Sequence, residues 1–101
     1  MATILVYPRA GLEIRQAELI WRAYHPERST LFADEYNHAL DKLQVTPRIG
    51  PPYPDLPQSR HILLKGCQHY LHYDYDLGKD EVRITGIENI RRGRKVGLHR
   101  R

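Results

Sequence analysis

The sequence has little of what builds disulfides, membrane spans or nucleotide-binding loops. It has a single cysteine, Cys67, so no internal disulfide can form, a pattern typical of a reducing cytoplasm. No apolar run is long enough to span a membrane, and residues 1–13 lack the pattern of a signal peptide. Glycine-rich phosphate loops, serine triads and internal repeats are also absent. We therefore expect one cytosolic domain with a modest core.

Acidic residues are missing from the C-terminal end. The segment "RRGRKVGLHRR" (91–101) holds six of the sixteen Lys and Arg residues and none of the twelve Asp and Glu residues. We divide the chain into a domain, residues 1–90, and a basic C-terminal arm, residues 91–101. Such an arm attracts phosphates or an acidic partner, and the alternative is a tail that only aids solubility.

Hydrophobic periodicity predicts a strand followed by two helices. The β-branched run "TILVY" (3–7) predicts a strand that is buried on both faces or paired inside the sheet. Apolar residues then recur at helical spacing over residues 9–24, and again in a second helix that starts at Pro26. The expected core stripes are Ala10, Ile14, Ala17, Trp21 and Tyr24 in the first helix, and Phe32, Tyr36, Ala39 and Leu43 in the second.

Three strands are predicted after a stiff connection. Residues 46–58 contain five of the seven prolines and should be extended. Short apolar or alternating runs at 60–65, 69–75 and 80–90 follow, separated by gaps of turn length. The predicted fold class is α+β: an N-terminal strand, a two-helix hairpin, and a three-stranded antiparallel meander, forming one sheet packed on the helices.

The ring-rich stretch "KGCQHYLHYDYDLG" (65–78) divides between the two sheet faces. Alternation places Leu71, Tyr73 and Tyr75 in the core. The same rule gives Tyr70, His72, Asp74 and Asp76 to the outer face. In the last strand it turns Val82 and Ile84 inward and Arg83, Thr85, Ile87 and Asn89 outward. The expected functional set on the outer face is His61, Lys65, Tyr70, His72, Arg83, Asn89 and Arg91.

This face allows two kinds of function. Acid–base chemistry on a phosphodiester would use His61, Tyr70 or His72 as acid and base, with Lys65, Arg83 and Arg91 holding the phosphate. The alternative is a polar surface that only binds a partner. Metal binding is not expected, because His69 and His72 fall on opposite faces. Cys67 has no orienting group, and no cofactor is predicted.

The order of elements is similar to that of a known family. The segments "YPRA", "FADEYNHALDKLQVTPRIGPPYP" and "RHILLKGCQHYLHYDYDLGKDEVRITGIENIRRGR" resemble the RelE/ParE superfamily of bacterial toxins from type II toxin–antitoxin systems, over nearly the whole chain. The resemblance implies a two-helix hairpin packed on an antiparallel sheet. It also implies an antitoxin partner whose C-terminal segment folds over the toxin, and a toxin–antitoxin hetero-oligomer.

The resemblance is closer to the ParE-like branch, whose members poison DNA gyrase. RelE-like members cleave mRNA in the ribosome and usually carry lysines and arginines on the outer face. Here His61, Leu63 and Tyr70 stand at such positions. RelE-like members also usually have a tyrosine near the C-terminus, whereas no tyrosine follows Arg91 in this sequence. "PRIGPPYP" and "IRRGR" resemble ParE-like segments, whose strand end often has a histidine where this chain has Asn89.

Three hypotheses follow from this comparison of branches. The first is a gyrase-poisoning toxin, not an enzyme, held silent by its antitoxin. The alternatives are a ribosome-dependent mRNA endoribonuclease and a degenerate toxin that only binds its antitoxin. The expected contact residues for target or antitoxin are Lys65, Tyr70, His72, Arg83, Asn89, Arg91, Arg92, Arg94 and Lys95.

Overall fold

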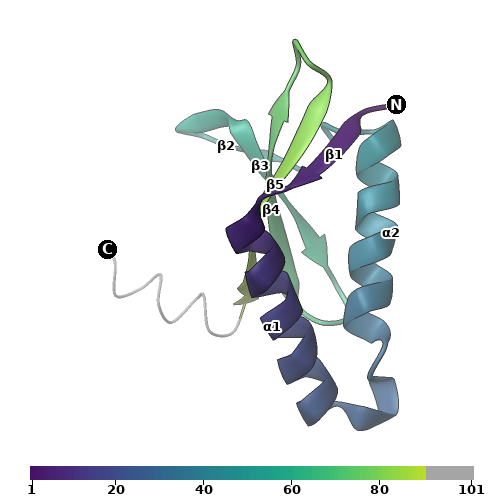
Figure 1. Ribbon diagram of the computed structural model, residues 1–101. Helices are drawn as coiled ribbons and strands as arrows, with labels where there is room; N and C mark the ends of the chain where they lie inside the picture. Colours follow the sequence, from purple (N-terminus) through teal and green to yellow (C-terminus); the bar gives the residue numbers. More distant parts are fainter. Residues whose placement is uncertain (91–101) are drawn as a thin grey trace.

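The computed structural model describes residues 1–90, so the predictions made for Arg91, Arg92, Arg94 and Lys95 lie outside the described residues. The elements in chain order are β1 (Thr3–Val6), α1 (Pro8–Tyr24), a 3-10 turn η1 (Pro26–Arg28), α2 (Leu31–Val45), β2 (Pro52–Tyr53), β3 (Leu56–Leu64), β4 (His69–Asp76) and β5 (Glu81–Asn89). Figure 1 shows the two helices running antiparallel, joined at one end by η1. The predicted α+β fold class is confirmed.

The helices pack against one five-stranded sheet, whose strand order is β1-β5-β4-β3-β2. β1 pairs parallel with β5, and the other pairs are antiparallel. Two features were not predicted. Pro52 and Tyr53 form a short edge strand inside the proline-rich connection, and β3 begins at Leu56 rather than at Arg60. These additions matter because they bring Tyr53 against the outer face of the sheet.

The helices differ from the prediction at their junction. Pro26 starts η1, and α2 begins only at Leu31. The Trp21 indole N–H donates to the carbonyl of Arg28 (2.8 Å), and its ring stacks on His25, which fixes this corner. Tyr24 was predicted in the core but is 75% exposed, because α1 ends there and its last turn extends past the sheet.

The core lies between the helices and the inner face of the sheet. Its largest fully buried side chains are Tyr73, Phe32, Leu43, Leu71, Ile84 and Val82, which confirms most of the predicted stripes. Tyr36 and Tyr75 pack against this core while partly buried. The prediction that β1 is buried on both faces or paired inside the sheet is wrong: β1 is an edge strand, and Leu5 is 45% exposed. Within residues 1–90, no helix is long and apolar enough to cross a membrane.

A β-bulge in β5 changes which residues face outward. His72 pairs with Gly86 and Tyr73 pairs with Ile84, so Thr85 is an extra residue on β5. Beyond the bulge, Ile87 is opposite Leu71 and Asn89 is opposite His69, both on the helix side. The predicted outward positions of Ile87 and Asn89 are therefore wrong, because one extra residue shifts the alternation. Glu88 takes the outward position instead.

Candidate functional site

Three side chains from three strands form a hydrogen-bonded series on the outer face. The Tyr53 hydroxyl on β2 lies 2.6 Å from Nδ1 of His72 on β4. Nε2 of the same ring lies 2.9 Å from Oε1 of Glu88 on β5. Because a carboxylate only accepts, Nε2 carries the proton. In the neutral ring Nδ1 then has a free lone pair, and the Tyr53 hydroxyl donates to it.

His61 and Tyr70 extend this series into a cluster of rings. The His61 ring centroid lies 4.8 Å from Tyr53 in a tilted arrangement and 4.8 Å from Tyr70, edge to face. His61 is opposite His72 in the β3–β4 register, so the two imidazoles share the outer face as predicted. Among residues 1–90, Nδ1 of His61 is the one buried side-chain nitrogen or oxygen without a hydrogen-bond partner.

The environment holds two of these rings in their neutral forms. Burial, followed by the nearby charge of His72, lowers the pKa of His61, and Glu88 partly offsets this. Burial, followed by the charges of Glu88 and Tyr70, raises the pKa of Tyr53. A neutral imidazole beside a phenol that keeps its proton can take a proton from a substrate and return one to it.

Cations are scarce on this face within residues 1–90. Arg83 faces outward, but its guanidinium bonds Glu81 (2.7 Å) and Asp76 (2.8 Å). Lys65 was predicted on the outer face. β3 ends at Leu64, so Lys65 belongs to the turn and lines a cleft beside α2 instead. In the same range, no group of three or more His, Cys, Asp or Glu side chains is arranged to hold a metal ion.

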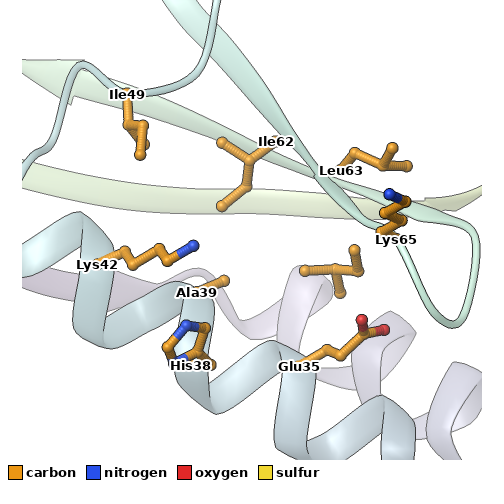
Figure 2. A pocket seen from close by; sticks show the side chains of 9 residues that line it. Glu35, His38, Ala39, Lys42, Ile49, Ile62, Leu63 and Lys65 are labelled. Carbon is orange, nitrogen blue, oxygen red and sulfur yellow. The ribbon is translucent and has the colours of Figure 1, made fainter.

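That cleft, of about 320 Å³, runs between α2 and β3 (Figure 2). Ile49, Ile62 and Leu63 give it an apolar wall, and Lys42 and Lys65 stand at its rim. Glu35, also at the rim, accepts from the backbone N–H groups of Gly66 and Cys67. On the side facing β2, residues 62–64 of β3 have no strand partner among residues 1–90. The cleft thus has an apolar wall, two lysines and one hydrogen-bonded carboxylate at its rim, and an open strand edge beside it.

Comparison with solved structures identifies the fold. One match, described as "Chromosomal ParDE TA system from P. aeruginosa", has a TM-score of 0.69 and 16% identity, and covers 89% of this chain and 97% of that chain. A second, "Crystal structure of the isolated E. coli RelE toxin, P21 form", has a TM-score of 0.68 and 16% identity, with 97% and 98% covered. The fold is RelE/ParE-like. No protein-family model matches the sequence, and a search of curated proteins found no match.

The two similarities are nearly equal, so a RelE/ParE-like fold alone does not separate the ParE-like from the RelE-like branch. On this fold, the sequence pattern correctly placed His61, Tyr70, His72 and Arg83 outward. It missed Tyr53 and Glu88. The alternation in β3 and β4 was regular, whereas Tyr53 comes from a two-residue strand between prolines and Glu88 from beyond a bulge.

Proposed function

We propose that this protein is the growth-inhibiting toxin of a bacterial type II toxin–antitoxin pair. The support is the RelE/ParE-like fold, which extends over nearly the whole chain and over nearly the whole of both matched structures. One of those structures is described as a ParDE toxin–antitoxin system and the other as a RelE toxin. Induced expression of the chain alone should arrest bacterial growth. Normal growth would instead favour a degenerate toxin that only binds an antitoxin.

The proposed target is DNA gyrase. The observation that carries this choice is the scarcity of cations on the outer face of residues 1–90, where Arg83 is already bound to two carboxylates. Cleavage of a phosphodiester passes through a highly charged transition state, which nucleases stabilise with cations. A face with rings and a carboxylate but no available cation is better suited to contact a protein than to cleave RNA.

A supercoiling assay with pure gyrase, relaxed plasmid and purified toxin tests this target. We expect loss of supercoiling and accumulation of cleaved DNA as the toxin concentration rises. The His72→Ala variant is the matched comparison, because a binding surface tolerates loss of an acid–base group better than a nuclease does. Full supercoiling at a large excess of toxin would rule out gyrase as the target.

One observation favours a second candidate, a ribosome-dependent mRNA endoribonuclease. Tyr53, His72 and Glu88 form a complete proton-transfer series, and His61 is a neutral imidazole beside it. In such an enzyme, His61 would take the proton of the RNA 2′-hydroxyl, and the Tyr53 hydroxyl, supported by its hydrogen bond to His72, would protonate the leaving 5′-oxygen. Primer extension on a translated mRNA distinguishes the two candidates. Cuts within codons that disappear in His72→Ala would establish cleavage.

The cleft between α2 and β3 is the proposed site for the antitoxin (Figure 2). An acidic, amphipathic segment would place apolar side chains against Ile62 and Leu63, and carboxylates near Lys42 and Lys65. The protein encoded next to this chain is the one to test. Lys42→Glu with Lys65→Glu should weaken its binding while growth arrest by the toxin persists; unchanged binding would exclude the cleft.

A further inference from the structure

We propose that Tyr53 is a nucleophile for acyl transfer, with His72 as its general base and Glu88 as the residue that positions His72. The substrate class is activated carboxylic esters. This activity is independent of the growth-inhibiting function proposed above, because it needs neither gyrase nor RNA. It rests on the geometry of the three side chains and on the way in which the sheet holds them.

The three groups meet the geometric requirement for an activated nucleophile. The nucleophile and its base are 2.6 Å apart, and the base and its orienting carboxylate are 2.9 Å apart. Both distances fall within hydrogen-bond reach, about 2.6–3.2 Å for such groups. Glu88 fixes the proton on Nε2 of His72, which leaves Nδ1 free to accept the phenolic proton. The arrangement is the same in kind as a serine–histidine–carboxylate triad, with a phenol as the nucleophile.

The scaffold keeps this geometry in place. His72 and Glu88 lie on the adjacent strands β4 and β5. Tyr53 lies on β2, and the other residue of β2, Pro52, pairs with Arg60 of β3. The His61 ring packs against the Tyr53 ring at 4.8 Å and limits its rotation. Prolines 51, 52 and 54 flank Tyr53 and restrict the backbone around it. A nucleophile held in this way loses little entropy when a substrate arrives.

The reaction balances in two steps. In the first, the Tyr53 oxygen bonds to the acyl carbon while Nδ1 of His72 takes the phenolic proton, and the alcohol leaving group departs with that proton. In the second, water attacks the acyl-tyrosine while His72 takes a proton from the water and returns it to the phenolate. The products are a carboxylic acid and free Tyr53. No metal, oxidant or reductant is required.

The other tyrosines provide internal comparisons. Tyr24 is the most exposed tyrosine among residues 1–90, with 75% of its surface open to solvent. Tyr75 donates to the Asp80 carboxylate, a much weaker base than imidazole. The Tyr73 hydroxyl is buried and accepts from the backbone N–H of Gly50. Exposure alone would therefore favour reaction at Tyr24, whereas the series with His72 and Glu88 favours Tyr53.

The test treats the full chain with p-nitrophenyl acetate and maps acetylated peptides at short times. We expect acetylation at Tyr53 to exceed that at Tyr24 by at least about tenfold, with a burst of p-nitrophenolate. Tyr53→Phe should remove the burst. His72→Ala should slow acetylation of Tyr53 by at least about tenfold, and Glu88→Gln should slow it by less, with Tyr53 still the site. Tyr24→Phe is the matched control and should keep the full burst.

A second measurement needs no variant, which guards against loss of folding. The ratio of acetylation at Tyr53 to that at Tyr24 should be high in the folded protein and fall to about one in urea. Equal acetylation in the folded state, a burst that persists in Tyr53→Phe, or acetyl groups on His72 in place of Tyr53 would overturn the proposal. None of these results bears on growth arrest, so failure of the acyl-transfer proposal would leave the proposed toxin function untouched, and the reverse also holds.

Discussion

Glu35 of α2 binds the turn between β3 and β4 through two backbone N–H groups, that of Gly66 at 2.8 Å and that of Cys67 at 2.9 Å. One carboxylate thereby joins the helical layer to the sheet, since each oxygen accepts one bond. A backbone bond, from the Ala2 N–H to the Gln44 carbonyl at 2.8 Å, joins the other end of α2 to the start of β1.

Removing this carboxylate should destabilise the fold. We expect Glu35→Ala to lower the free energy of unfolding by about 1–3 kcal/mol, because two charge-assisted hydrogen bonds are lost and two N–H groups lose their partner. Glu35→Gln keeps one strong acceptor and should cost roughly half as much. Urea unfolding measures both. Glu27→Gln, at an exposed position of η1, is the control. An unchanged midpoint in Glu35→Ala would contradict the assigned role.

Gly50 should not tolerate a side chain. A Cβ there would lie 2.3 Å from the carbonyl oxygen of His61 and 2.9 Å from the hydroxyl of Tyr73. We expect Gly50→Ala to lower the free energy of unfolding by about 1–3 kcal/mol, because the backbone contact cannot relax as a flexible side chain would. Gly78→Ala is the matched control, because a Cβ at Gly78 would lie 3.5 Å from the nearest atom, Oδ1 of Asp76, which is an ordinary van der Waals distance. Equal thermal stability of the two variants would show that the loop at Gly50 adjusts freely.

Alkaline solution should destabilise the protein through Cys67. Burial, followed by the hydrogen bond and charge of Glu35, raises the pKa of this thiol to about 12 from its usual 9.0. Above about pH 9 the unfolded chain loses the proton while the folded chain retains it, so stability falls as the pH rises. The expected loss from this thiol is about 1 kcal/mol between pH 9 and pH 10.

Cys67→Ala should lack this component, although its stability at neutral pH is lower because a buried side chain is shortened. The measurement is the difference between wild type and variant in unfolding free energy across the alkaline range. If the two proteins lose stability in parallel, the thiol is not held protonated by the fold.

Acidic solution should destabilise the protein through His69. This side chain is buried, with Nδ1 2.8 Å from the Cys67 carbonyl and its ring edge-on to Phe32. Burial, partly offset by that carbonyl and by Glu35, lowers its pKa. As the pH falls below about 6.5, the unfolded chain takes up a proton that the folded chain resists, so stability decreases. Unfolding free energies of wild type and His69→Gln at pH 7.5 and 5.5 should converge on acidification; a constant difference would refute this.

The basic arm should be needed for toxicity. Replacing Arg91, Arg92 and Arg94 together with alanine should abolish growth arrest while the circular dichroism spectrum stays that of the wild type. The reason is electrostatic: the arm concentrates positive charge that can meet gyrase, DNA or RNA. Arg9→Ala with Arg22→Ala removes positive charge from α1 as a control. Full arrest by the triple variant would show that the arm does not face the target.

The sequence predicted the features that depend on regular periodicity. The helical stripes, the core position of Tyr73 and the outward position of His61 and His72 all follow from spacings of 3.6 or 2 residues. The errors lie where periodicity stops. Lys65 is one residue beyond the end of β3, and Asn89 is beyond a one-residue bulge. Tyr53 was missed because a two-residue strand among prolines has no period, and only the tertiary fold brings it to His72.

The extra residue in β5, Thr85, has a consequence for how this surface can change through evolution. The bulge at Thr85 lets the strand present Glu88 beside His72 rather than Ile87, while the core residues before it keep their places. Loss of that single codon would remove the bulge and leave Gly86, Ile87 and Glu88 in regular pairing with His72, Leu71 and Tyr70, so Glu88 would stay on the outer face. A one-codon deletion at such a position can therefore be accepted in evolution, because it leaves both the core and the acid beside His72 in place.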